Sequence, residues 1–86
     1  MKIVFHKHFE KQFLKLRPAE KKRFKERKDI FMHDPYHPVL NNHPLRGTYK
    51  GYRSINVGGD LRAVYTLVND DAAFFVAIDR HSNLYS

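Results

Sequence analysis

The stretch GYRSINVGGDLRAVYTLVNDDAAFFVAI, residues 51–78, decides the fold. Residues 51–57 alternate in a β pattern, and two glycines at 58–59 predict a hairpin turn because glycine accepts positive φ at no steric cost. Residues 61–68 and 72–78 are two further predicted strands, separated by an Asn-Asp-Asp turn. The last strand is apolar enough to lie inside a sheet. The stretch therefore predicts an antiparallel meander of three strands.

The first half of the chain predicts a short strand and two helices. KIVF at 2–5 is β-prone, and the period changes to a helical one over 8–16. Pro18 then suits the first turn of a second helix over 19–33, because the first helical position needs no backbone N–H. A loop rich in proline and asparagine follows at 34–44 and ends the helical part.

Apolar residues on the two predicted helices identify the surface that they bury. Phe9, Phe13 and Leu16 fall at i, i+4 and i+7, which places them on one helix face. Phe24 and Phe31 lie seven residues apart on an otherwise basic helix. The sequence therefore predicts one α+β domain over residues 1–86. Its elements follow in the order β-α-α-β-β-β, with a helical hairpin on one face of a twisted antiparallel sheet.

The charge of the chain indicates an anionic partner. The net charge is +7 over 86 residues, and half of the positions between Lys11 and Lys28 are lysine or arginine. Such an excess favours nucleic acid, a membrane surface or an acidic protein as partner, although a solvated helix face also explains a run of lysines.

Three classes of protein fit the sequence poorly. The chain has no cysteine, so it has neither a disulfide framework nor a thiolate site, which is compatible with a cytoplasmic location. Its first residues lack the long apolar region of a signal peptide, and no apolar run is long enough to span a membrane. Six histidines are present, but no pair has a sharp metal-ligand spacing, so we expect neither a metal nor another cofactor.

Polar residues that could carry chemistry gather in three places. The first is the segment 42–53, the second is 56–62 and the third is the end of the chain. In a meander, residues from a loop, a hairpin and the last strand can converge on one surface. The candidates are His43, Arg46, Lys50 and Arg53, then Asn56, Asp60 and Arg62, then Arg80, His81 and Tyr85.

HPLRGTYKGYRSINVGGDLRAVYTL (43–67), with HSNLY (81–85) after it, resembles the RelE/ParE superfamily of bacterial toxins, and most closely its YafQ-type branch. The resemblance extends over essentially the whole chain. It implies the toxin of a type II toxin–antitoxin pair, which enters the ribosomal A site and cuts messenger RNA without a metal. It also implies an attack of the ribose 2′-oxygen on the adjacent phosphate, which needs a base, an acid and cations at the phosphoryl oxygens.

The resemblance also assigns roles by position. It implies a catalytic set formed by His43, Asp60, Arg62, His81 and Tyr85. We expect further contacts to RNA from Lys21, Lys22, Lys25, Arg46, Lys50, Arg53, Asn56 and Arg80. One position departs from the family pattern, because Asn56 stands where YafQ-type chains carry a histidine. An amide does not titrate usefully, so one acid–base group of the pattern is missing.

Two other functions remain open at this stage. A ParE-like toxin would share the fold but inhibit gyrase without a nuclease site, and a basic RNA-binding module would explain the charge alone. The histidines at 43 and 81 with Asp60 favour the ribonuclease. The expected partners are the ribosome, messenger RNA and an acidic antitoxin, but no membrane. We expect the antitoxin to cover the basic helices or the sheet face bearing Arg53 and Arg62.

Overall fold

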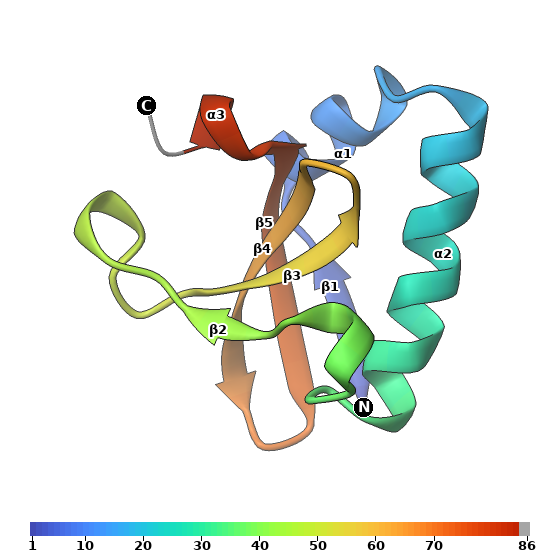
Figure 1. Cartoon of the computed structure of the whole chain (residues 1–86). Helices are drawn as coiled ribbons and strands as arrows, with labels where there is room; N and C mark the ends of the chain where they lie inside the picture. Colours follow the sequence, from blue (N-terminus) through green and yellow to red (C-terminus); the bar gives the residue numbers. More distant parts are fainter. Residues whose placement is uncertain (85–86) are drawn as a thin grey trace.

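A computed structural model describes residues 1–84 (Figure 1). Its elements are β1 (Lys2–Phe5), α1 (Lys7–Leu14), α2 (Pro18–His33), the 3-10 helix η1 (Pro38–Leu40), β2 (His43–Pro44), the 3-10 helix η2 (Gly47–Tyr49), β3 (Arg53–Gly58), β4 (Leu61–Asn69), β5 (Ala72–Arg80) and α3 (His81–Leu84). The predicted α+β fold and its order of main elements are confirmed. None of the helices in residues 1–84 is long and apolar enough to cross a membrane.

The five strands form one mixed sheet in the order β1-β5-β4-β3-β2. β3, β4 and β5 form the predicted antiparallel meander. β1 pairs in parallel with β5, from Lys2 opposite Ala72 to Phe5 opposite Phe75. Between β1 and β5 the chain passes through both helices and through β2, β3 and β4, and it returns in the same direction as β1. The two-residue strand β2 and the terminal helix α3 are additions to the predicted order.

Aromatic rings fill the space between the helices and the sheet. Phe75 on β5 lies at the centre, with ring centroids 5.2 Å from Tyr65 and 5.4 Å from Phe31. Phe9 and Phe24 bring the two helices onto the same ring at 5.9 and 6.0 Å. The predicted apolar stripes therefore do face one core, which burial of large rings stabilises.

The helices cover one face of the sheet, and α1 also covers part of its edge. β1 pairs with β5 only as far as Phe75, so the N–H groups further along β5 need another partner. The side chain of Gln12 on α1 supplies one, because its Oε1 accepts from the Ile78 N–H at 3.0 Å. The face opposite the helices is open, and the candidate site lies on it.

Candidate functional site

Strand register brings the predicted polar residues into one row on the open face. Asn56 on β3 lies opposite Arg62 on β4, and Arg62 lies opposite Asp79 on β5. His43 on β2 lies opposite Ser54, which alternation places on the same face as Asn56. The sheet therefore places His43, Asn56 and Arg62 on the same face, with His43 in the row next to that of the other two.

The chain after β5 joins this row at the β3–β4 turn. The His81 N–H donates to the Asp60 carbonyl at 2.7 Å, so α3 begins directly beside the turn (Figure 1). Asp79 fixes the helical turn, because its Oδ1 accepts from the Arg80 N–H at 2.8 Å and from Asn83 Nδ2 at 3.0 Å. The backbone thus holds His81, which is exposed, next to Asp60.

Hydrogen bonds also hold the Arg62 guanidinium at this turn. Its Nη1 donates to the carbonyls of Gly59 at 2.9 Å and Leu61 at 3.2 Å. A guanidinium has five N–H donors in a planar fork, so these bonds orient the cation and leave other hydrogens for an anion. Arg62 is therefore a positive group at the end of the sheet where Asp60 and His81 lie.

The ring of His43 is fixed by a single backbone contact. Its Nδ1 lies 2.8 Å from the carbonyl oxygen of Asn41. Because a carbonyl oxygen only accepts, Nδ1 must carry the hydrogen, and Nε2 of the neutral ring is then the proton acceptor. Asn41 itself has a positive φ of 44°, a left-handed conformation that asparagine tolerates better than most residues. The sharp turn before β2 thus sets the tautomer of His43.

Two buried side-chain oxygens on this face have no hydrogen-bond partner within residues 1–84. They are Ser54 Oγ and Asn56 Oδ1. Most buried polar atoms in proteins are hydrogen-bonded, so such atoms call for an explanation. Asn56 Oδ1 can only accept a hydrogen bond, so this buried oxygen lacks a donor among the described residues.

Arg80 takes part in ion pairs within the protein. Its Nη1 pairs with Glu20 of α2 and lies 3.7 Å from an Asp60 carboxylate oxygen. The hydrogen bond from Arg80 lowers the pKa of Glu20 below its usual value, and that bond in turn raises the pKa of Arg80. Arg80 thereby links α2 to the β3–β4 turn. Its predicted contact with RNA requires a phosphate to compete with Glu20.

The Glu20–Arg80 pair predicts a pH-dependent part of the stability. A carboxyl whose pKa is lowered on folding stabilises the protein above its unfolded pKa, which is about 4.5 for a glutamate. That contribution is lost as pH falls through the folded pKa. We expect Glu20→Gln to destabilise the protein at pH 7 and to have little effect well below pH ~4. Urea unfolding of both proteins from pH 3 to 8 measures the difference. A difference that stays constant over this range contradicts the prediction.

Arg53 is separated from the row by the geometry of its strand. Arg53 pairs with Tyr65, which faces the core, whereas Asn56 and Arg62 face away from it. The expectation that one sheet face carries both Arg53 and Arg62 is therefore wrong, because residues three apart on a strand point to opposite faces.

A buried network accounts for the position of Arg53. Its Nε donates to Asn42 Oδ1 at 2.7 Å, and Asn42 Nδ2 donates to the Tyr65 hydroxyl at 2.7 Å. The guanidinium also lies over the Tyr36 ring, 5.4 Å from its centroid. Burial raises the pKa of the Tyr65 hydroxyl above its ordinary value. Arg53 thus helps to hold the loop before β2 against the sheet.

The other predicted RNA contacts lie outside the row. Arg46 and Lys50 flank η2 in the exposed loop between β2 and β3. Lys21, Lys22 and Lys25 lie on α2, which covers the opposite face of the sheet. Tyr85 lies outside the described residues, so its predicted role is a hypothesis from sequence alone.

Sequence reasoning missed two parts of this surface. The first is the pair Asp79 and Gln12, which position the end of β5. In the sequence, only the four-residue spacing of Asp79 and Asn83 indicates the hydrogen bond between them. A hollow of about 420 Å³ also opens on the same face. It is lined by His6, His8, Thr48, Tyr49, Tyr52, Phe74 and Val76. The two tyrosines near η2 are its only sequence signal.

Within residues 1–84, no group of three or more His, Cys, Asp or Glu side chains could hold a metal ion.

The fold is that of the small toxins of the RelE/ParE type, as two solved structures show. This chain aligns with the crystal structure of YafQ from E. coli strain BL21(DE3) with a TM-score of 0.77 and 24% identity, over 99% of this chain and 98% of that one. A YoeB/ParE toxin from Agrobacterium tumefaciens gives a TM-score of 0.78 at 16% identity, over 94% and 99% of the two chains.

A structure of a complex gives the same result. The E. coli DinJ–YafQ toxin–antitoxin complex matches with a TM-score of 0.74 and 24% identity, over 99% of this chain and 97% of that one. No protein-family model and no curated protein matches the sequence. At these sequence identities the structural likeness establishes the fold. The chain has the RelE/YafQ-type toxin fold, so the resemblance stated from the sequence is confirmed for the fold.

Proposed function

We propose that this chain is the toxin of a type II toxin–antitoxin pair and that it cleaves messenger RNA in the ribosomal A site. The observation that carries the proposal is that strand register places His43, Asn56 and Arg62 on one sheet face, while Asp60 and His81 lie together at the end of that sheet. A gyrase inhibitor of the same fold has no need for two histidines at a cationic site. The structure of YafQ bound to DinJ supports an antitoxin as partner, since YafQ shares this fold. The net charge of +7 favours an acidic one.

In the proposed mechanism, His43 Nε2 accepts the proton of the ribose 2′-hydroxyl. The 2′-oxygen attacks the adjacent phosphorus, the bond to the 5′-oxygen breaks, and His81 protonates that leaving oxygen. The products are a 2′,3′-cyclic phosphate and a 5′-hydroxyl. Arg62 stabilises the charge that builds on the phosphoryl oxygens, the kind of contribution that is often the largest in such reactions.

Three other groups support these steps. The Asn56 side-chain amide, which is partly exposed, orients the ribose or a phosphate oxygen. The Asp60 carboxylate, held near Arg80 at the turn that binds the His81 backbone, is a second candidate acceptor for the 2′-hydroxyl proton. The rings that line the hollow on the same face stack on the unpaired bases of the message, as aromatic side chains do in RNA-binding proteins.

The deciding experiment adds the purified protein to a cell-free translation reaction and maps the ends of the message. Cuts that appear only when ribosomes are present, and that fall within the translated codon, are the expected result. Inhibition of gyrase supercoiling without such cuts favours the ParE-like alternative. A protein that binds ribosomes with neither effect is a non-catalytic RNA-binding module.

Asn56 offers a separate test, because this position departs from the family pattern. We expect Asn56→Ala to slow cleavage by the equivalent of one hydrogen bond, about 0.5–1.5 kcal/mol. Asn56→His restores a titratable ring, and we expect it to raise the rate or to move the pH optimum toward ~6.5, the ordinary pKa of imidazole. Single-turnover rates on programmed ribosomes from pH 5.5 to 9 measure both effects. If Asn56→Ala is as damaging as loss of His81, the roles are assigned wrongly.

The lysines of α2 are proposed to hold ribosomal RNA. Replacing Lys21, Lys22 and Lys25 with glutamine should leave stability nearly unchanged, because surface substitutions usually cost less than ~0.5 kcal/mol each. Ribosome affinity should fall most at low salt, and the slope of log K against log salt should decrease by roughly 0.7–0.9 per lost phosphate contact. Filter binding at several salt concentrations measures the slope. An unchanged slope means that this run of lysines is only a solvated helix face.

A further inference from the structure

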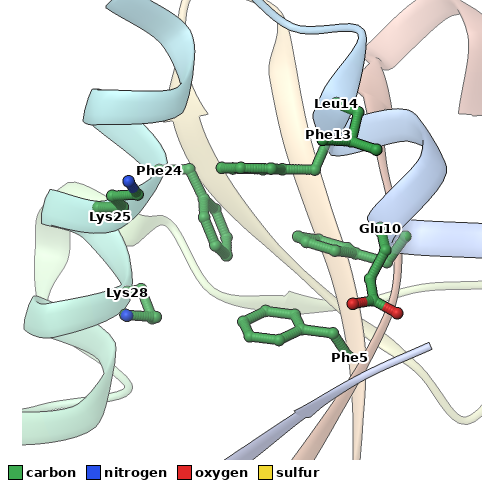
Figure 2. A pocket seen from close by; sticks show the side chains of 8 residues that line it. Phe5, Glu10, Phe13, Leu14, Phe24, Lys25 and Lys28 are labelled. Carbon is green, nitrogen blue, oxygen red and sulfur yellow. The ribbon is translucent and has the colours of Figure 1, made fainter. Parts of the chain in front are cut away.

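A second concave feature lies away from the proposed active site, between the two long helices and β1. It is an apolar pocket of about 290 Å³ (Figure 2). Its walls are Phe5, Phe9, Glu10, Phe13, Leu14, Phe24, Lys25 and Lys28. An engineered apolar cavity of ~150 Å³ is large enough to bind benzene, so this pocket has room for a large apolar side chain.

The floor of the pocket is rigid and its rim is exposed. Phe9 and Phe24 are both only 2% exposed and belong to the core, and the Phe13 ring packs edge-on against Phe24 at 5.7 Å. Leu14 at the end of α1 is 71% exposed, although it borders this apolar surface. A leucine so placed would gain from burial by a partner that fills the pocket.

The charge around the pocket is strongly positive on one side. Lys21, Lys25 and Lys28 recur at i, i+4 and i+7, so they form one stripe along the side of α2 that faces α1. Lys25 and Lys28 line the pocket, and the Lys21 ammonium lies 6.0 Å from the centre of the Phe13 ring. Glu10 of α1 is the one acidic residue among the pocket walls.

We propose that this pocket receives one large apolar side chain from an acidic segment of the antitoxin, with the carboxylates of that segment on the lysine stripe. That the occupant is an antitoxin rests on the proposed function. That the occupant is acidic and carries an apolar side chain is inferred from the pocket itself. The lysines at the rim can pair with RNA phosphates, but the phenylalanine walls offer a phosphate no partner, so they favour an occupant with an apolar side chain. A second copy of this chain would place two lysine stripes against each other, and such like-charge contacts disfavour binding.

This docking mode has a consequence for how the toxin is neutralised. Lys21 and Lys25 are also proposed contacts to ribosomal RNA, and they lie on the side of the molecule opposite His43 and Arg62. The antitoxin would therefore block attachment to the ribosome through these lysines, whether or not another part of it reaches the open sheet face.

The test measures the affinity of pocket variants for the small acidic protein encoded beside this chain, purified separately, by isothermal titration calorimetry. The variants are Leu14→Glu and the double change Lys25→Glu with Lys28→Glu. The matched control is Lys2→Glu with Lys7→Glu, which changes the net charge as much as the double variant but lies outside the pocket. Circular dichroism and thermal unfolding verify that each variant is folded.

We expect each pocket variant to bind at least ~10-fold more weakly, as central interface residues typically do on substitution, and the control to change less than ~3-fold. Fifteen-residue synthetic peptides that tile the acidic protein give a second readout. The peptide that binds should be acidic, and changing its largest apolar residue to alanine should weaken it by a similar factor. That weakening should disappear in the Leu14→Glu variant.

Three results overturn the inference. They are wild-type affinity in both pocket variants, an equal loss in the control, and binding peptides that lack an apolar anchor. Loss of ribosome affinity without loss of affinity for the acidic protein assigns the pocket to the ribosome instead. Ribosome-dependent cleavage is measured in parallel without the partner, so a failure of the proposed enzymatic function is recognised independently of the pocket.

Discussion

We expect His81→Ala to lower the single-turnover rate of cleavage on programmed ribosomes by ~10²-fold or more, the usual contribution of a general acid or base. Ribosome affinity should remain nearly unchanged. The reason is geometric, because the backbone bond to the Asp60 carbonyl survives the substitution and continues to hold α3 at the β3–β4 turn. Only the imidazole, and with it the proton for the leaving oxygen, is removed.

Two further variants separate proton transfer from docking. His81→Gln retains a polar side chain that forms hydrogen bonds but does not titrate, so it should be about as slow as His81→Ala. His33→Ala removes an exposed histidine from the end of α2 and should leave the rate unchanged. Equal losses of ribosome binding and cleavage in His81→Ala would identify His81 as a docking residue and would contradict its proposed role as the acid.

The second large effect concerns stability. Phe75→Ala should lower the free energy of unfolding by about 3–5 kcal/mol, as loss of a buried phenylalanine does in other proteins. Phe75 is fully buried, and its ring contacts rings from β1, both long helices and β4. Because small domains unfold with only about 5–15 kcal/mol, the variant should be close to unfolding at 37 °C.

The neighbouring residue provides the control for this prediction. Phe74 lies on the same strand but points to the open face, where it is partly exposed. Phe74→Ala should cost about 1 kcal/mol, a typical value for a single substitution. Urea denaturation of the two variants compares the same chemical change on the two faces of one strand. Similar losses for both would mean that the core is not centred on Phe75.

Local patterns predicted most of the fold because each element carries its own signal. The Gly-Gly turn, the alternation in β3 and β4 and the spacing of Phe9, Phe24 and Phe31 are all short-range features. The parallel pairing of β1 with β5 was not predictable in this way, since it joins residues about 70 positions apart along the chain.

The candidate site was predictable only in part, and the family resemblance supplied its residue types. Once the strand is placed, the alternation of side chains along it predicts that Arg53 faces the core side. The hydrogen bonds that link Arg53 to Asn42 and Tyr65 do not follow from the sequence. The pairing of Arg80 with Glu20 depends on how α2 crosses the sheet. No sequence pattern encodes that crossing, so the sequence alone could not separate a phosphate-binding arginine from a structural one.

The parallel pairing of β1 with β5 also determines how late in synthesis the fold, and with it the candidate site, can be completed. β1 is among the first segments to leave the ribosome, yet its partner strand and the centre of the aromatic core are among the last. Contacts between residues so distant in sequence form slowly, because the intervening loop must close first. His81 reaches the β3–β4 turn only after β5 is in place. A nascent chain still held in the exit tunnel therefore lacks a complete candidate site. Under the proposed function, this delay gives a newly made antitoxin time to bind before the toxin can act on a ribosome.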